Sequence, residues 1–481
     1  MKQTTDKQPD QKLWRPFLRL AKYLPDEFLS SSEEWLFLVS EYGISKTPTR
    51  PTTKEEWLQF YAHCHDGWKK AQTQIAEFLT DAVRRLIEAK ANERQQHRLK
   101  NKEGRKQARE EVRRISLEMT FARRILDVIL WTIFAGEHST LRRLVVDGGE
   151  HSLSAENIAV AMRVADEVNK NPFVMAVSTD MLSLVHVGDL IVTNRESGSI
   201  EFVELKAGAK NIEIAKTVEF AVRSECEMFE ALATAGYDET DKQHYARVKR
   251  QAKRNKMIVS TIQDERGTDP NTGSHVIIQA TPAPPEFWTE RIQQCYEKLS
   301  DEKKWAIDVI DECVYLGVYS DQFSAFAGFN AWMAKMGCES KIFNLMDSFH
   351  DLLVRPLGAV HIEPDLRTKI FRGDILVIMC LDIRKFIELG NEMNPNGMRL
   401  ATKAETAQMK SHRLGDFTLN GRYIVMEIDG EVMYVGAGTR DRILFDQHYP
   451  SQLLAYRLAG GPPSQYSKEM SAGEERTSGE A

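Results

Sequence analysis

The clearest pattern of apolar and polar positions lies in the middle of the chain. An almost continuous apolar run at residues 184–192 predicts a buried central strand, interrupted only by His186 and Asp189. A polar turn at 194–199 follows, and a second apolar run at 200–206 predicts the partner strand. We therefore expect a β-hairpin whose first strand carries an aspartate in otherwise apolar surroundings.

The length of the turn predicts how the two strands align. A symmetric loop pairs Thr193 with Ile200, and the same register places Asp189 opposite Glu204. Opposed side chains of an antiparallel pair lie roughly 4.5–5.5 Å apart at Cβ, where like charges destabilise the sheet. A divalent metal between the carboxylates would remove that repulsion. Glu204 and Lys206 are two positions apart on a strand, so they project from the same face.

Two interpretations of this hairpin remain open. An ionised carboxylate in a buried strand is costly unless it is paired or bound to a metal. Magnesium takes oxygen ligands, often one or two carboxylates completed by water and substrate phosphate, and this favours a metal site. In the other interpretation the hairpin is structural, and Lys206 neutralises Glu204 in a salt bridge.

The order of these residues is similar to a known motif. Gly188-Asp189, followed by Glu204 and Lys206 with one residue between them, resembles the PD-(D/E)XK nuclease superfamily over about residues 150–285. The superfamily name has proline before the aspartate, where this chain has glycine. The resemblance implies a restriction-endonuclease-like αβββαβ core, in which helices flank a mixed sheet.

The resemblance also implies roles for the motif residues. Asp189, Glu204 and the backbone carbonyl of Leu205 would bind Mg²⁺, for which Mn²⁺ can substitute. Lys206 would orient the attacking water or stabilise developing negative charge. Catalysis by this set would hydrolyse a phosphodiester bond.

A basic segment follows the hairpin. Residues 242–256 contain seven Lys or Arg and no acid, and Arg247, Gln251 and Arg254 share one face of the predicted helix. The resemblance implies that Gln251 lies near the metal, with Tyr245 or Arg247 supporting it. The helix is either a solvated charged face or a phosphate-binding surface, and the formal net charge of −6 for the whole chain favours the second. The phosphate-binding residues would be Arg247, Lys249, Arg250, Lys253 and Arg254.

A helix is predicted before the hairpin. Ser154 is a suitable N-cap for a helix that continues to about residue 170. Glu156 lies in the first turn of this helix. The resemblance offers Glu156 a supporting role as an additional acid of the metal site, and its alternative role is to complement the helix dipole.

The remaining pattern predicts several further elements. A long polar helix is expected at 93–114, a strand pair at 257–262 and 275–280, and a helix at 286–318. Asp429-Gly430 predicts a hairpin between strands at 423–428 and 431–435. The predicted order of domains is a helical N-terminal region at 1–135, a nuclease-like domain at 150–285, an additional C-terminal α/β domain at 286–460 and a disordered tail at 461–481.

A second Gly-Asp pair occurs in the C-terminal part of the chain. Gly373-Asp374 precedes a predicted strand at 375–383, but no Glu-x-Lys follows at a usable distance. We therefore expect a single nuclease-like site.

Composition sets the class of protein. A chain of 481 residues with 42% hydrophobic and 28% charged residues is typical of a soluble protein with two or three domains. Its six cysteines form no CxxC pair, which argues against structural zinc and a disulfide framework. The N-terminal residues do not resemble a signal peptide and the apolar runs are too short to span a bilayer, so a cytoplasmic location is expected.

We interpret the chain as a metal-dependent nuclease, with DNA as the expected substrate and endonuclease activity as the expected reaction. By analogy of architecture its setting would be bacterial restriction or antiphage defence. The alternatives are a nucleic-acid-binding module or a regulatory interaction protein with a catalytically silent nuclease fold. A homodimer is raised by the resemblance alone, because cutting both strands needs two sites.

Overall fold

The computed structural model describes residues 15–134, 140–141, 144, 153–183, 185, 188–205, 209–224, 226–264, 266–268, 275–277, 286–350, 353–410 and 417–459. The chain is a mixed α and β protein, as the sequence predicted. Its residues divide into two compact units, one of Leu24–Ile278 and the other of Met1–Tyr23 with Gln279–Ala481. No helix within the described ranges is long and apolar enough to cross a membrane.

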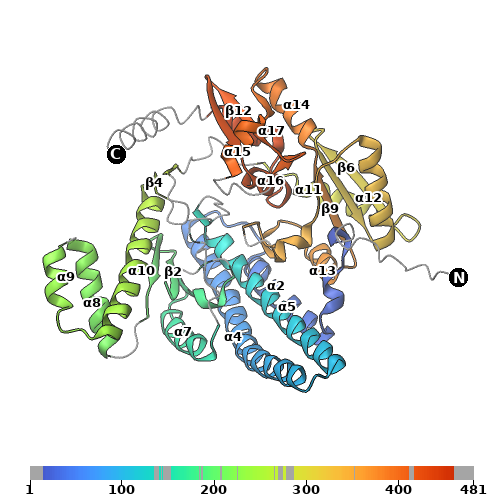
Figure 1. Ribbon diagram of the computed structural model, residues 1–481. Helices are drawn as coiled ribbons and strands as arrows, with labels where there is room; N and C mark the ends of the chain where they lie inside the picture. The colour runs from blue at the N-terminus through green and yellow to red at the C-terminus, as the bar shows by residue number, and fades with distance from the viewer. Residues whose placement is uncertain are drawn as a thin grey trace. The chain divides into compact units, whose positions relative to one another are not determined.

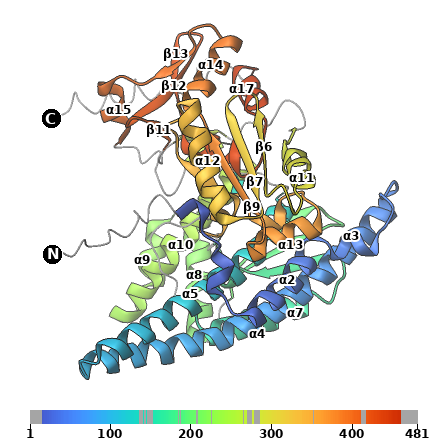
Figure 2. The ribbon, with the colours of Figure 1, turned by 90° about the vertical axis from the view of Figure 1, so that its right-hand side faces the viewer.

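The unit Leu24–Ile278 contains a pair of long helices. Helices α4 (Lys54–Arg98) and α5 (Lys102–Ile133) lie side by side and run antiparallel (Figures 1 and 2). The prediction of one continuous helix at 93–114 is wrong, because the chain reverses between α4 and α5. Lys100 takes a φ of 55° in this reversal, and the side chain of Asn101 caps the start of α5.

Further helices and a small sheet complete this unit. They are α2 (Asp26–Ser40), α3 (Tyr42–Lys46), α7 (Ala155–Val168), β1 (Val174–Ser178), η3 (Thr179–Met181), β2 (Leu190–Asn194), β3 (Ser199–Val203), α8 (Ala209–Ser224), α9 (Glu227–Ala233), α10 (Glu239–Gln263), β4 (Arg266–Thr268) and β5 (His275–Ile277). Strands β1, β2 and β3 pair antiparallel in that order, so β2 is the central strand, as predicted.

Helix α7 packs on the sheet through its apolar side. Ser154 accepts a hydrogen bond from the Asn157 backbone N–H at 3.0 Å, which confirms the predicted N-cap. α7 packs against β1 and α4. The buried side chains that join α7 to the sheet are Ala161, Ala165, Ala176 and Leu190.

Helices α8 and α10 pack against each other over their own apolar cluster. The buried members are Ile214, Val218, Val222, Tyr237, Tyr245 and Val248. The predicted strand at 257–262 is wrong, because α10 continues through this segment. Ile258 and Thr261, three positions apart on one face, are both buried, so burial on a helical face overrides the β-branched composition. The predicted hairpin is formed instead by the short strands β4 and β5.

The second unit contains two antiparallel sheets surrounded by helices (Figures 1 and 2). Strands pair in the order β6-β7-β9-β8 in one sheet, while β12 is flanked by β10, β11 and β13 in the other. The elements of this unit are η1 (Arg15–Phe17), η2 (Leu20–Tyr23), α11 (Thr289–Glu297), β6 (Trp305–Ile310), β7 (Val314–Tyr319), α12 (Gln322–Met336), β8 (Ile342–Asn344), η4 (Leu345–Phe349), η5 (Leu357–Ala359), α13 (Pro364–Arg372), β9 (Leu376–Leu381), α14 (Ile383–Met393), β10 (Met398–Leu400), α15 (Lys403–Lys410), β11 (Thr418–Leu419), β12 (Arg422–Ile428), β13 (Glu431–Val435), α16 (Ala437–Leu444) and α17 (Pro450–Ala459).

The predicted helix at 286–318 is wrong after its first half. Only α11 is helical, and β6 and β7 follow it as a hairpin. Asp311 and Glu312 both take positive φ in the turn, with none of the glycine that usually marks such a hairpin. The predicted hairpin at Asp429-Gly430 is confirmed, because Ile428 pairs with Glu431 and both turn residues have positive φ.

Candidate functional site

The two motif carboxylates lie just beyond the paired ends of β2 and β3. The predicted register is confirmed, since Thr193 pairs with Ile200 and the ladder ends where Leu190 pairs with Val203. Asp189 immediately precedes β2 and Glu204 immediately follows β3, and both residues are half-buried. The Asp189 N–H donates to the Val203 carbonyl at 2.8 Å.

The Asp189 carboxylate lies beside the peptide that follows Glu204. Its Oδ2 accepts a hydrogen bond from the Leu205 backbone N–H. Because that N–H belongs to the peptide bond between Glu204 and Leu205, the carboxylate of Asp189 lies within one peptide unit of Glu204. The strand pair therefore brings together the two acids that the sequence placed opposite each other.

Gly188 allows the chain to turn into β2 at this point. The predicted strand at 184–192 is wrong at its start, because β2 begins at Leu190 and Gly188 has a φ of 72°. Residues 184, 186 and 187 lie outside the described residues. Proline is restricted to φ near −65°, so Pro in place of Gly188 could not adopt this backbone. Glycine at this position therefore has a conformational reason.

Thr179 holds the backbone of the Gly188-Asp189 segment. Its N–H donates to the Asp189 carbonyl at 3.0 Å, and its hydroxyl donates to the Gly188 carbonyl. Thr179 is buried at the end of β1. Local sequence patterns do not reveal Thr179, because its role depends on a contact between segments ten positions apart that only the fold creates.

Helix α10 provides two amide donors to Glu204. Gln251 Nε2 donates to Glu204 Oε1 at 2.9 Å, and Asn255 Nδ2 donates to the same oxygen at 3.1 Å. The two amides are four positions apart, so they lie on one face of α10. Gln251 was expected near the site, whereas Asn255 was missed. Its spacing from Gln251 is the signal that could have identified it.

Three other predicted site residues have different outcomes. Lys206 lies outside the described residues. Leu205 is half-buried, and its side chain packs against the cluster beneath α7. Glu156 is exposed in the first turn of α7 and is not among the described residues that line the pocket around Glu204.

The basic residues of α10 divide into exposed and paired side chains. Arg247, Arg250 and Lys253 are exposed, as a phosphate-binding surface requires. Lys249 is instead paired with Glu230 of α9, which occupies its ammonium group. The remaining predicted cation, Arg254, is half-buried on the same helix.

Tyr245 is part of the interface between α8 and α10. Its side chain is 5% exposed and its ring lies 6.1 Å from that of Tyr237. Burial raises the pKa of Tyr245 to about 12, so the hydroxyl stays protonated at neutral pH. Tyr245 therefore has a structural position, and Asn255 occupies the place beside Gln251.

Glu204 forms part of the wall of a pocket between β3, α8 and α10. The cavity has a volume of about 680 Å³. Phe202 and Glu204 are two positions apart and project from the same side of the chain into it. The other lining residues are Ala215, Lys216, Val218, Glu219, Val222 and Arg223 of α8, and Val248, Gln251, Ala252, Asn255 and Lys256 of α10.

Buried side chains of α4 support the outer edge of the sheet. Gln72 Nε2 donates to the Ala176 carbonyl at 3.0 Å, and Gln72 Oε1 accepts from the Ser178 N–H at 3.0 Å. Gln72 thus replaces a strand partner along the edge of β1. His65 Nδ1 lies 3.0 Å from the Pro172 carbonyl, and burial lowers the pKa of His65 to about 4, so this histidine is neutral at pH 7.

A buried ion pair on α5 supports the segment after β1. Arg124 and Asp127 are both fully buried and lie 2.9 Å apart between Nη1 and Oδ2. Asp127 Oδ1 accepts from the Ser183 N–H at 3.0 Å, and Asp127 Oδ2 accepts from the Ser183 hydroxyl. Since Ser183 lies four positions after Thr179, α5 stabilises the segment that holds Asp189.

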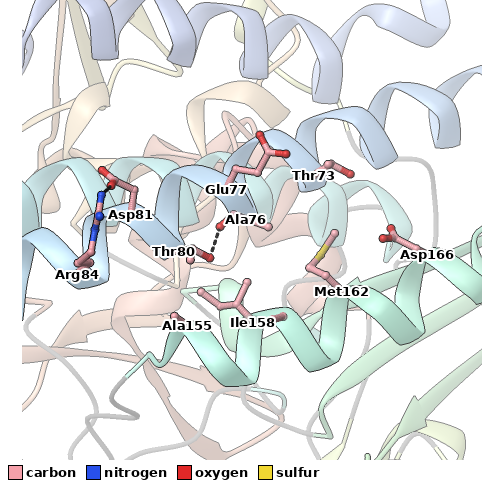
Figure 3. A pocket seen from close by; sticks show the side chains of 11 residues that line it. Thr73, Ala76, Glu77, Thr80, Asp81, Arg84, Ala155, Ile158, Met162 and Asp166 are labelled. Atoms are coloured by element: carbon pink, nitrogen blue, oxygen red, sulfur yellow. Dashed lines mark hydrogen bonds and ion pairs between the residues drawn. The ribbon is translucent and has the colours of Figure 1, made fainter.

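A second pocket of this unit is lined by more acidic than basic side chains. It lies between α4 and α7, has a volume of about 620 Å³ and contains an apolar floor that includes Ile158 and Met162 (Figure 3). Arg84 is paired with Asp81 at its rim. The other acids of the lining are Glu77 and Asp166. An excess of carboxylates repels phosphate, so this pocket does not suit a nucleic acid.

The acids at the motif suit a hard cation. Carboxylate and carbonyl oxygens are ligands that Mg²⁺ prefers, and two protein carboxylates are a common set when water and substrate phosphate complete the shell. Hydrogen bonds from amide groups orient both carboxylates, as donors that bond to metal ligands do in metal sites. Among the described residues, no cluster of three or more His, Cys, Asp or Glu side chains is arranged to hold a metal. The motif pair would therefore depend on backbone, water or substrate oxygens for the remaining ligands.

Comparison of this chain with models of protein families, with curated proteins and with solved structures found no match.

Proposed function

We propose that this protein is a metal-dependent nuclease that hydrolyses phosphodiester bonds of nucleic acid, with DNA as the first substrate to test. The observation that carries the proposal is the meeting of Asp189 with the Glu204–Leu205 peptide, while Gln251 and Asn255 donate to Glu204. Exposed cations on the same helix, α10, would attract a phosphate backbone.

The fold that we propose for residues 150–285 is a restriction-endonuclease-like αβββαβ core. The order α7, β1, β2, β3 and then helix supports this assignment. The expected mixed sheet differs from the described one, because β1, β2 and β3 pair antiparallel throughout. β4, which follows α10 and would be the last strand of that order, pairs among the described residues with β5 in a separate two-stranded sheet. The biological setting that we propose, by analogy of architecture, is restriction or antiphage defence.

In this proposal Asp189, Glu204 and the Leu205 carbonyl would hold Mg²⁺ or Mn²⁺. When bound, such an ion polarises a phosphoryl oxygen and lowers the pKa of water. Gln251 and Asn255 keep the Glu204 carboxylate oriented, and the left-handed Gly188 with Thr179 keeps Asp189 beside it. Lys206 would stabilise the negative charge that develops at the phosphate.

The test is cleavage of plasmid and linear DNA with Mg²⁺, with Mn²⁺ and with EDTA. Wild type is compared with Glu204→Gln, Lys206→Ala and Asn255→Ala. We expect metal-dependent cleavage that disappears in the first two variants and falls about tenfold in the third, since loss of a group that orients a metal ligand typically costs 10–100-fold. Glu201→Gln is the matched control, because Glu201 is an exposed acid on β3 three positions before Glu204.

Two outcomes would change the assignment. If folded wild type binds DNA but cleaves none with either metal, and the variants bind equally well, the protein is a binding module with a silent nuclease fold. If wild type neither binds nor cleaves nucleic acid, a regulatory interaction protein becomes the better assignment.

A further inference from the structure

The pocket beside Glu204 has the size and lining of a small-molecule site. Its volume of about 680 Å³ falls within the roughly 300–1,000 Å³ typical of ligand pockets. Proteins bind a nucleic-acid duplex on an open groove or a broad charged surface. Binding of a duplex therefore does not account for a pocket of this kind. A pocket of this volume can hold a ligand about as large as one nucleotide.

The shape of the pocket follows from two small residues. Val218 of α8 and Val248 of α10 are buried members of the apolar cluster that joins these helices, and both border the pocket. Ala215 on α8 and Ala252 on α10 also line the pocket. Their short side chains leave the space that larger apolar residues would fill.

The lining combines apolar surface with positive charge. Phe202 provides an aromatic ring at the β3 side, and valine side chains of both helices provide apolar contacts. Lys216 and Arg223 are exposed at the pocket, where they could meet a phosphate, whereas Lys256 Nζ donates to the Val222 carbonyl at 3.3 Å. These three cations outnumber the two acids of the lining, Glu204 and Glu219. This combination matches the parts of a nucleotide, since a base stacks on aromatic and apolar surface while its phosphate needs cations.

We propose that this pocket binds one unpaired nucleotide of the substrate, so that the strand cut beside Glu204 is single-stranded, flapped or frayed at its end. The inference rests on the proposed nuclease function. A base within a duplex is stacked and paired, so its faces are not accessible to Phe202 and the valines. Only an unpaired base can enter, and entry places its phosphate near the motif carboxylates.

Binding separates this inference from catalysis. We would titrate three fluorescein-labelled probes of one sequence, namely single-stranded DNA, single-stranded RNA and blunt duplex DNA, and follow fluorescence anisotropy in EDTA and again with Ca²⁺. Wild type is compared with Ala252→Leu, which fills the pocket, and with Lys216→Gln, which removes a surface cation. Ala246→Leu is the matched control, because Ala246 is half-buried on α10 outside the pocket lining.

We expect wild type to bind a single strand at least about tenfold more tightly than the duplex, since stacking of one base is worth about that factor. Ala252→Leu should remove this preference without changing duplex affinity. Lys216→Gln should weaken single-strand binding and reduce its dependence on salt. Ala246→Leu should behave as wild type. The RNA arm identifies which kind of single strand the pocket prefers.

Equal affinity for single strand and duplex, or an unchanged preference in folded Ala252→Leu, overturns the inference. If that result accompanies metal-dependent cleavage, the nuclease function stands and only the pocket assignment fails. If cleavage is absent but the pocket-dependent preference is present, the pocket assignment stands and the nuclease function fails.

Discussion

Gly188-Asp189 and Gly373-Asp374 are two Gly-Asp pairs that precede strands, β2 and β9, and their surroundings differ. Gly188 and Gly373 have nearly the same backbone, with φ of 72° and 76°. Asp189 is half-buried, and its carboxylate meets the backbone beside Glu204. Asp374 is exposed at the end of α13. The same dipeptide, with a similar glycine φ, therefore lies beside a second acid in one unit and ends a helix in the other.

The difference arises from the neighbouring strand. β3 lies beside β2 and ends at Glu204, which two amides of α10 orient. β7 lies beside β9, and the chain after it enters α12, where the Asp321 carboxylate accepts from the Ser324 N–H at 2.6 Å. Asp321, the acid that follows the strand beside Gly373-Asp374, thus caps a helix. A motif of this type is defined by the end of the partner strand as well as by the dipeptide.

Access differs as well. Every residue of β7 and β9 is buried, so these two strands have no surface for a substrate. The residues of β3 are exposed or half-buried, and one face of this strand borders the pocket between α8 and α10. The small sheet can therefore present its strand ends to a ligand, whereas the larger sheet forms a core.

The largest effect should come from exchanging the acids themselves. Asp189→Asn should reduce metal-dependent cleavage by about 10³-fold, because a bound ion contributes several kcal/mol of charge stabilisation in such reactions. Asp374→Asn should leave the rate unchanged. Initial rates on labelled DNA, with circular dichroism to verify folding, measure both. Equal losses of cleavage rate in the two variants would show that Asp189 and Asp374 do not differ in function.

The next effect concerns the buried ion pair behind Asp189. Asp127→Ala removes the carboxylate that pairs with the buried Arg124 and frees Ser183, which should lower the free energy of unfolding by about 3–4 kcal/mol. Urea unfolding followed by fluorescence measures this loss. At temperatures where the variant remains folded, cleavage should also fall, because the segment that positions Asp189 is released. Unchanged stability would show that the pair is not needed.

A pH effect of similar size should come from His65. Burial lowers its folded pKa to about 4 from an unfolded value of about 6.5, so between these values the unfolded chain binds more protons. Stability is complete above pH 6.5 and falls by about 3 kcal/mol as the pH drops towards 4. His65→Gln should flatten this part of the unfolding curve measured from pH 7 to pH 4. His448, with a pKa lowered to about 3 in the second unit, serves as the comparison through His448→Gln.

The smallest effect should distinguish the two glycines. Alanine at either position must adopt a left-handed backbone, which costs about 1–2 kcal/mol of stability in both units. A Cβ at Gly188 would also lie 3.1 Å from the Val203 carbonyl, so the β2–β3 ends must shift. Gly188→Ala should therefore reduce cleavage as well as stability, whereas Gly373→Ala should reduce stability alone. Thermal unfolding and initial rates together separate the two cases.

Local patterns in the sequence predicted the local parts of the fold. The register that joins Thr193 to Ile200, the cap at Ser154 and the turn at Asp429-Gly430 were confirmed, because each depends on residues close together in sequence. The helix expected at 286–318 failed, because the turn at Asp311 and Glu312 contains no glycine. Its strands are stabilised by pairing with β9, which is distant in sequence.

The candidate site was predictable to the same degree. The juxtaposition of Asp189 and Glu204 follows from the register of a hairpin, and the place of Gln251 near them was implied by the family resemblance. Thr179 and Asn255 were missed because their contacts join separate elements. The role of Lys206 stays a prediction, since it lies outside the described residues.

The contacts of α4 and α5 with the β1 segment affect both the order of folding during synthesis and the choice of fragment boundaries. Gln72 and Asp127 are translated about a hundred and about fifty residues before the backbone groups that they bind at Ser178 and Ser183. The helical hairpin can therefore form on the ribosome before the strands emerge, and it then acts as their template. A fragment that begins near residue 150 would lack both partners, and its β1 edge would be open to pairing with other molecules. Any fragment designed to contain Asp189 and Glu204 should therefore begin before α4.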